Sequence, residues 1–376
     1  MKLLRLLLPA CLFAVSLRAA ATAPVNLGEP LPTVVLSDGR TLHDVKIIGF
    51  GATTVMAKWD GGRGTIAYEI LPDEIRQAAE QHKPTVSPVA GPEASAEPGV
   101  KLGADARPDS ALTIARRGFT THLLRKESLG QPPEPPPTGV LDLVAYPGPL
   151  GPMAAYITPP PGDGKRHPAI IWLVGGTSNS IGSTFWQPAP ADNDQSASAF
   201  RAARIVTMYP SLRGGNSNPG YREWLLGEVD DVIAAARALA TLDYVDPHRI
   251  YLGGHSTGGT LALLVAESSN QFRAVYAFGP VGDTLGYGKE TLPFDSSNPR
   301  EAELRSPVLW LDSIRVPTSV FEGVNPPSNL KPLLDMAARN HNPLVQFRQV
   351  PGYTHFSLVA PMVRKLSEII AQDTGK

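Results

Sequence analysis

One serine stands between glycines in the stretch LGGHSTGGTLALL, which runs from Leu252 to Leu264. Gly254, Ser256 and Gly258 form the pattern G-x-S-x-G, with an apolar run before it and a helix-like run after it. This pattern is typical of a serine nucleophile on a sharp turn between a strand and a helix, where small neighbours let the two backbones come close. The helix N-terminus would also favour a developing anion. The alternative is an ordinary serine that caps a helix.

The sequence from about Ala115 to the C-terminus resembles the α/β-hydrolases, most closely their secreted prolyl-oligopeptidase-like and dienelactone-hydrolase-like members. Four motifs carry the resemblance: VDPHRIYLGGHSTGG, MYPSLRGGN, IIWLVGG and VPGYTHFS. Together they extend over about 260 residues, and they are specific for the fold rather than for a substrate. The resemblance implies a doubly wound, mostly parallel α/β sheet and a nucleophile at Ser256.

A serine hydroxyl needs a general base, which in this fold follows the nucleophile along the chain. Only His341 and His355 lie C-terminal to Ser256. His341 precedes a predicted strand, so we expect it at the opposite edge of the sheet. His355 follows the last predicted strand, in VPGYTHFSLVAP, and is predicted to be the base. His255, beside the serine, is interpreted as a packing or turn residue.

The acid that would orient this histidine departs from the family pattern. Family members usually carry an aspartate three residues beyond the glycine that follows the seventh strand, but this sequence reads VFEGVNPPSN and has Pro326 there. Glu322 closes the run PTSVFEG, and Asp283 follows AVYAFGPVG. We favour Glu322, because this strand usually supplies the acid, with Asp283 as the alternative. A dyad without an acid, or an inactive site, is also open.

The resemblance further implies two N–H donors that would stabilise an oxyanion. One is Thr257, the residue after the nucleophile. Val174, Gly175 and Gly176 occupy the place where many relatives have His-Gly-Gly, so Gly176 is predicted to be the second donor, although a tight turn alone would also explain the glycines. Arg213, in SLRGGNSNPG, could bind a substrate carboxylate, but anchoring of its own loop is the favoured interpretation.

The elements that would position these residues are apolar runs of strand length that alternate with helical segments. We expect a hairpin over about 140–160, strands at 168–176, 203–211, 248–256, 272–280, 317–323 and 344–352, and helices near 196–203, 225–242, 257–268, 329–340 and 361–372. Continuous apolar runs indicate parallel strands that are covered on both faces. Such sheets bind ligands at the carboxyl ends of their strands, which is where the candidate site residues fall.

The first residues, MKLLRLLLPACLFAVSLRAAATA, combine Lys2 and Arg5 with a short apolar run and small residues near Ala23. They predict a secretory signal peptide over residues 1–23. Its removal would change the formal charge from −1 to −4, since three cations and no acid are lost, and would remove Cys11, the only cysteine. We therefore expect a secreted or periplasmic protein without disulfides and without a membrane anchor after cleavage.

Three further segments follow the signal peptide. Residues 24–80 alternate β-branched runs with turn signals at SDGR and DGGRG, and they predict a small β-module that resembles the SH3-like modules of bacterial secreted proteins. Residues 81–112 are rich in Pro, Ala, Ser and Gly, which indicates a linker, and residues 113–376 would form the hydrolase domain. The β-module could contact a protein or cell surface, or could be a passive accessory.

Composition narrows the function classes. Lys and Arg total 34 against 35 for Asp and Glu, so no strong field favours nucleic acid as a partner. No HExxH, Cys cluster, P-loop or G-x-G-x-x-G after a strand occurs, so no metal or cofactor is implied. We expect a secreted serine esterase acting through an acyl-enzyme. A peptidase is less favoured, because peptide-cleaving relatives usually carry a propeller that a module of about 50 residues cannot form. A non-catalytic binding protein is the other alternative.

Overall fold

The computed structural model describes residues 25–27, 29–50, 54–60, 62–81, 110–187, 189–190 and 192–375. The chain divides into two compact units, one made of the described residues up to Gln81 and the other of those from Ser110 onwards. The predicted signal peptide, residues 1–23, and most of the predicted linker lie outside the described residues. Within the described ranges, no helix is long and apolar enough to cross a bilayer.

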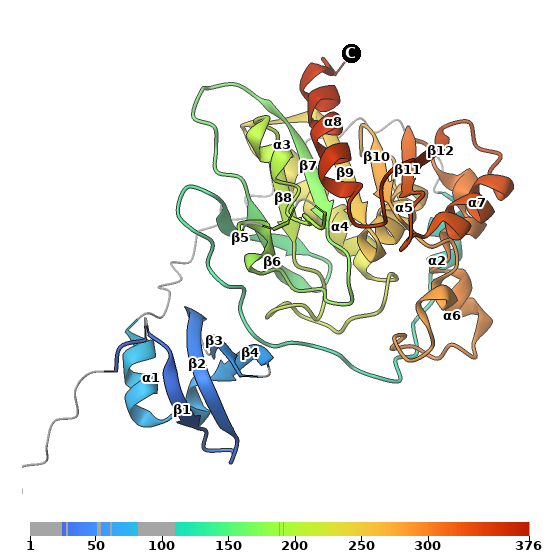
Figure 1. Ribbon diagram of the computed structural model, residues 1–376. Coiled ribbons are helices and arrows are strands. Elements are labelled where there is room, and N and C mark those ends of the chain that lie inside the picture. The colour runs from blue at the N-terminus through green and yellow to red at the C-terminus, as the bar shows by residue number, and fades with distance from the viewer. Residues whose placement is uncertain are drawn as a thin grey trace, which may run out of the picture. The chain divides into compact units, whose positions relative to one another are not determined.

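The N-terminal unit is a four-stranded antiparallel sheet, drawn in blue in Figure 1. On its second strand, Val45 and Ile47 are buried while Asp44 and Lys46 are exposed, which is the alternation of a sheet with one covered face. The elements are β1 (Leu31–Val35), β2 (Thr41–Phe50), β3 (Thr54–Trp59), β4 (Gly62–Ala67), the 3₁₀ turn η1 (Tyr68–Ile70) and α1 (Asp73–Glu80). This sheet confirms the small N-terminal β-module.

The larger unit is built on one eight-stranded sheet (Figure 1). Its strands are β5 (Asp142–Gly148), β6 (Gly151–Ile157), β7 (His167–Leu173), β8 (Val206–Pro210), β9 (Val245–His255), β10 (Val275–Phe278), β11 (Thr318–Gly323) and β12 (Val345–Val350). Their spatial order is β12-β11-β10-β9-β7-β8-β6-β5. Strands β7 to β12 run parallel, and only β5 and β6 add antiparallel pairs. The predicted doubly wound, mostly parallel α/β fold is confirmed.

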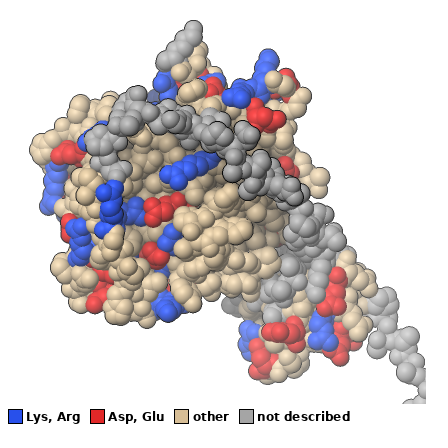
Figure 2. Space-filling model, turned by 180° about the vertical axis from the view of Figure 1, so that it is seen from behind, with Lys and Arg blue, Asp and Glu red and all other residues tan. Residues whose placement is uncertain are grey.

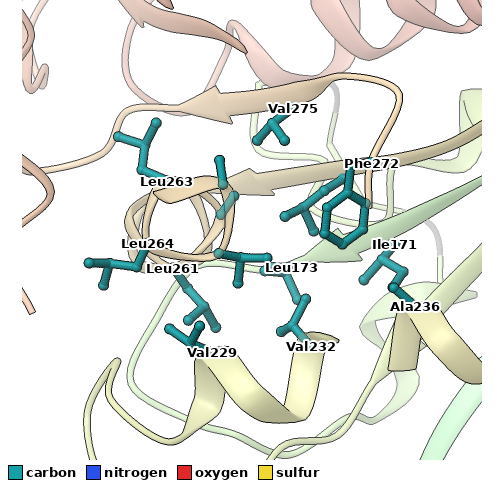
Figure 3. Close-up of a cluster of buried hydrophobic side chains, with 14 of the residues drawn as sticks. Ile171, Leu173, Val229, Val232, Ala236, Leu261, Leu263, Leu264, Phe272 and Val275 are labelled. Carbon is teal, nitrogen blue, oxygen red and sulfur yellow. The ribbon is translucent and has the colours of Figure 1, made fainter. Parts of the chain in front are cut away.

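Helices cover both faces of this sheet. They are α2 (Ala111–Arg116), α3 (Ser198–Ala202), α4 (Glu228–Ala240), α5 (Thr257–Ser268), α6 (Pro299–Glu303), α7 (Leu330–Arg339) and α8 (Val359–Gln372), with 3₁₀ turns η2 (Ser183–Phe185), η3 (Thr284–Tyr287), η4 (Pro307–Leu309) and η5 (Leu311–Ser313). On β7, Ile171 and Leu173 join a core with α4 and α5, whereas Ile170 and Trp172 join a second core with α3 and α8. Figure 3 shows part of the first core. The strand is therefore apolar from Pro168 to Leu173 because it faces two cores.

Helix α2 corrects the predicted start of the main domain. The sequence predicts a linker over residues 81–112, but the side chain of Ser110 caps a helix by accepting the N–H of Thr113. Leu112 is fully buried in the main core. A helix of six residues shows too little of the helical period to be found from the sequence, and the same holds for α6.

The surface of the larger unit carries both signs of charge. Figure 2 shows basic and acidic side chains interspersed on one face, with wide uncharged areas between them. This distribution agrees with the balanced composition and offers no field of a single sign on that face.

Candidate active site

Ser256 sits on the sharp turn between β9 and α5. Its backbone has φ 56° and ψ −118°, a sparsely populated conformation for a residue with a side chain, which costs about 1–3 kcal/mol. The N–H of Ser256 donates to the carbonyl of Phe278, at the end of the neighbouring strand β10, over 2.7 Å. The side chain is partly exposed. The turn therefore holds the hydroxyl at the carboxyl edge of the sheet.

The glycines around Ser256 have a steric cause. A Cβ at Gly254 would lie 2.3 Å from the carbonyl oxygen of Gly258, and a Cβ at Gly258 would lie 2.3 Å from the carbonyl oxygen of Leu173. On the other side, a Cβ at Gly175 would lie 2.9 Å from the Cβ of Ser256. Only glycine fits at these positions, because the strand, the turn, the helix and the loop after β7 approach within backbone contact.

His355 and Glu322 meet at the same edge of the sheet. The imidazole Nδ1 of His355 lies 3.0 Å from Oε2 of Glu322, which is fully buried at the end of β11. The other carboxylate oxygen accepts the N–H of Gly323 over 2.8 Å, which fixes the carboxylate. Since Nδ1 faces a carboxylate and donates to it, the other ring nitrogen, Nε2, remains free to accept a proton from a serine hydroxyl.

Gly279 links this pair to the serine. It directly follows Phe278, whose carbonyl binds the N–H of Ser256. A Cβ at Gly279 would lie 2.4 Å from Cε1 of His355 and 2.7 Å from Oε2 of Glu322. The histidine and its acid therefore pack directly against the end of β10, beside the turn that carries Ser256. No sequence motif marks Gly279, because its left-handed φ of 58° follows from tertiary structure.

The other candidates for base and acid lie elsewhere. His341 is exposed and lies between α7 and β12, which is the opposite edge of the sheet, as expected. Asp283 is exposed and caps η3 by accepting the N–H of Leu285 over 2.9 Å; its other neighbour is the hydroxyl of Ser306 at 3.3 Å. The structure thus brings Glu322, and not Asp283, to His355.

The loop with Pro326, where family members usually place the acid, has a different part here. The next residue, Pro327, accepts the backbone N–H of His355 through its carbonyl over 2.8 Å. The hydroxyl of Ser328 in turn donates to the carbonyl of Gly323. The loop therefore holds the backbone of the histidine, while the acid is supplied by Glu322 from within the strand.

Thr257 and Gly176 lie together beside the serine. Thr257 is the first residue of α5, where N–H groups have no intrahelical acceptor. Its hydroxyl donates to the carbonyl of Gly176 over 2.5 Å, and Gly176 has a left-handed φ of 102°. Both residues line a cavity of about 50 Å³. The structure therefore places the two predicted oxyanion donors in one small region.

His255 is more than a turn residue. It is buried, and its Nε2 lies 2.8 Å from the carbonyl oxygen of His355, to which it must donate because a carbonyl only accepts. Burial, followed by the charge on His355, lowers the pKa of His255 to about 3, so the ring is neutral at pH 7. Nδ1 lies 2.9 Å from the amide oxygen of Gln195; in the neutral ring that nitrogen accepts, so the amide must turn its NH₂ group towards it.

Arg213 is engaged by two carboxylates of the protein. It is buried, binds Asp231 through Nε at 3.0 Å and Nη2 at 2.8 Å, and binds Glu223 through Nη1 at 2.7 Å. These contacts anchor the loop after β8 to helix α4. The interpretation of Arg213 as a loop anchor agrees with this geometry, and it is favoured over a role in binding a substrate carboxylate because two carboxylates of the protein already engage the guanidinium.

Comparison with known proteins supports the fold and the expected relatives. Residues 192–307, which include Ser256 and Asp283 but neither Glu322 nor His355, match the prolyl oligopeptidase family. A puromycin hydrolase structure is 21% identical with a TM-score of 0.50, covering 62% of this chain and 39% of that one. Dipeptidyl peptidase 4 of Porphyromonas gingivalis is 14% identical with a TM-score of 0.50, covering 90% of this chain and 45% of that one.

A puromycin-hydrolyzing peptidase of Mycobacterium tuberculosis is 23% identical with a TM-score of 0.47, covering 62% of this chain and 39% of that one. This chain therefore spans less than half the length of each of these structures. No curated protein matches the sequence. The chain has the α/β-hydrolase fold, as the sheet order and the turn at Ser256 show. The family match confirms the predicted resemblance to the serine hydrolases of the prolyl oligopeptidase group.

Proposed function

We propose that this protein cleaves carboxylic esters through a covalent acyl-enzyme, with Ser256 as nucleophile, His355 as general base and Glu322 as the orienting acid. The observation that carries the proposal is the 3.0 Å contact between His355 Nδ1 and Glu322 Oε2 at the edge of the sheet where the turn holds Ser256. A buried carboxylate on Nδ1 selects the tautomer whose Nε2 can accept a proton.

The first half of the reaction forms the acyl-enzyme. His355 Nε2 takes the proton of the Ser256 hydroxyl while the oxygen attacks the ester carbonyl carbon. The carbonyl oxygen becomes an oxyanion, and the N–H groups of Thr257 and Gly176 stabilise it; one such donor is worth about 3 kcal/mol. The tetrahedral intermediate then collapses, His355 gives its proton to the departing alkoxide oxygen, and the alcohol leaves.

The second half regenerates the enzyme. Water loses a proton to His355 and attacks the acyl carbon, the same N–H groups stabilise the second oxyanion, and Ser256 leaves with the proton returned by His355. Glu322 stabilises the imidazolium that forms in each half. The Gly323 N–H bond to its second oxygen keeps the carboxylate in place during both steps.

Two observations favour esters over peptides. Arg213, the residue considered for a substrate carboxylate, is held by Asp231 and Glu223, so this group offers no charge to a peptide end. The cavity beside the candidate oxyanion donors is also small, at about 50 Å³. The match to the prolyl oligopeptidase family favours a peptidase as the second candidate, because that family is named for peptide cleavage.

A fluorophosphonate probe and a substrate panel test this proposal. We expect the probe to label the wild type and to fail with Ser256→Ala, and we expect p-nitrophenyl esters to be cleaved faster than aminoacyl p-nitroanilides. Faster cleavage of the amides would favour the peptidase. A folded wild type that neither takes the probe nor cleaves either class would support the binding protein instead.

We also propose that the protein is secreted or periplasmic and that its N-terminal unit contacts a protein or cell surface. The support is the sequence pattern of residues 1–23 and the folded β-module that follows it. N-terminal sequencing of the protein recovered from the cell envelope or medium should begin after Ala23; an intact N-terminus at Met1 would contradict the cleavage.

A further inference from the structure

The cavity next to the candidate oxyanion donors has the size of a small acyl group. Its volume is about 50 Å³. One water needs about 10–15 Å³ measured in the same way, so the cavity holds about three to five non-hydrogen atoms. Besides Gly176 and Thr257, the wall includes the bulky side chains of Phe185, Trp224, Leu225 and Leu261. The space is therefore bounded largely by apolar surface.

The position of the cavity decides which part of an ester it would take. Its lining comes from the ends of β7 and β8, the segments after them, and the beginnings of α4 and α5; among the described residues, none of the lining belongs to the segment that carries His355. A leaving alcohol receives its proton from the general base and therefore lies on the side of His355. The acyl substituent would then lie on the side away from His355, which is the side of the cavity.

The wall of the cavity is firmly held. Trp224 packs edge-to-face on Tyr287 with ring centroids 5.2 Å apart, and the Arg222 guanidinium lies 4.6 Å from the Trp224 ring centroid. Nε of the fully buried Arg305 donates to the carbonyl of Trp224 over 2.9 Å. Trp224 and Leu225 have φ of 56° and 70°, which only such over-determined surroundings maintain. The wall is thus poorly suited to move aside for a longer chain.

We propose that this cavity is the acyl-binding subsite and that it restricts the enzyme to esters of short carboxylic acids, from acetyl to butyryl. The proposal rests on the ester hydrolysis proposed above. The cavity begins at Gly176 and Thr257, beside Ser256, and its volume would admit one to three carbons beyond the carbonyl carbon of an acyl group on that serine. A longer chain has to displace the wall.

The first test varies the two sides of the ester separately. With p-nitrophenyl acetate, butyrate and octanoate, we expect kcat/KM of the wild type to fall about tenfold or more between butyrate and octanoate. With acetate esters of alcohols of increasing length, we expect a change of less than about threefold. Equal cleavage of octanoate and acetate would overturn the proposal, and so would selectivity that follows the alcohol rather than the acid.

Two leucines of the same helix provide a matched pair of variants. Leu261 lines the cavity, whereas Leu263 is equally buried and does not, and Figure 3 shows the two side chains on different sides of α5. Leu261→Ala should raise the octanoate-to-acetate ratio of kcat/KM about fivefold or more, and Leu263→Ala should leave it unchanged while losing comparable stability. A similar change in both variants would show a general loosening and would contradict the subsite.

Leu225→Gly is a second enlarging variant, at a position where glycine offsets part of the cost of losing a buried leucine. It removes a side chain from the cavity wall at a position with left-handed φ, where glycine relieves strain. We expect the same rise in the octanoate-to-acetate ratio. An unchanged ratio in folded Leu225→Gly and Leu261→Ala would overturn the proposal. Fluorophosphonate labelling separates the failures: labelled enzyme that lacks acyl selectivity contradicts only the subsite, whereas unlabelled, inactive enzyme contradicts the ester hydrolysis beneath it.

Discussion

His255 and His355, one hundred positions apart in sequence, face each other with ring centroids 4.5 Å apart, and Nε2 of His255 donates to the backbone carbonyl of His355 over 2.8 Å. The residue before the proposed nucleophile therefore holds the backbone of the proposed base. Because the two rings share one buried contact, a change at His255 should move the base relative to the serine.

Replacement of His255 should lower turnover without abolishing it. His255→Phe keeps a flat ring but removes the N–H donor, and we expect kcat to fall about tenfold to a hundredfold because small misplacement of a reacting group is costly. His255→Gln, which can restore a donor, should recover part of the loss. The measurement is kcat and KM for p-nitrophenyl acetate, with KM nearly unchanged. A fully active Phe variant would show that the bond is not needed for positioning.

The low pKa of His255 predicts a dependence of stability on pH. In the unfolded chain the ring is protonated below pH 6.5, its ordinary pKa, whereas in the folded protein its pKa is about 3. Between pH 3 and pH 6.5 the unfolded chain therefore binds one proton more than the folded protein. The free energy of unfolding should therefore fall by about 1.4 kcal/mol for each pH unit below 6.5 from this residue alone. Denaturant unfolding of His255→Phe between pH 6.5 and pH 4.5 should show a shallower slope than the wild type; parallel slopes would contradict a neutral, buried His255.

Glu267 on helix α5 predicts the opposite dependence. Its side chain is fully buried, and neither oxygen has a hydrogen-bond partner among the described residues. Burial raises the pKa of Glu267 well above 4.5, so the folded protein favours the neutral carboxyl. As the pH rises, the unfolded chain ionises freely and is stabilised relative to the folded protein, so the free energy of unfolding falls. Glu267→Gln should be more stable than the wild type by about 1 kcal/mol or more at pH 8, with the difference shrinking towards pH 4.5. Calorimetry at both values checks the sign.

Arg213 should matter for stability rather than for substrate affinity. Removal of the guanidinium leaves the buried carboxylate of Asp231 without its partner, so Arg213→Met should cost about 3–5 kcal/mol of unfolding free energy. The matched control is Lys331→Met, which breaks an exposed ion pair with Asp335 and should cost less than about 1 kcal/mol. A stable Arg213→Met variant whose only change is a raised KM would restore the substrate-binding role.

Much of the fold and part of the site could be predicted from local pattern. Long apolar runs required two-sided burial, which identified the parallel strands, and the helix over 257–268 lies where the pattern placed it. The glycines around Ser256 are required because backbone segments approach closely there, so the pattern G-x-S-x-G predicts the tight packing of the turn. The end of β11 pointed to Glu322, although the contact that separates it from Asp283 depends on how β11 and the segment after β12 come together.

The remaining features depend on contacts between distant segments. The bond from His255 to the carbonyl of His355 and the approach of Gly279 to the same ring join β9, β10 and the segment after β12. No local period records such contacts. Arg213 is an example of a local pattern that fits more than one role. An arginine after a strand suits ligand binding, but in the structure its Nε and Nη2 donate to Asp231, eighteen residues later. The short helix α2 was missed because capping by Ser110, rather than periodicity, defines it.

Glu322 is proposed to be the acid that acts through His355, and turnover of two carboxamide variants tests this most directly. Glu322→Gln preserves the shape of the side chain but not its charge, so kcat/KM for p-nitrophenyl acetate should fall about a hundredfold or more. Asp283→Asn, at an exposed cap, should stay within about threefold of the wild type. A nearly normal rate in folded Glu322→Gln together with an inactive Asp283→Asn would contradict the proposed site.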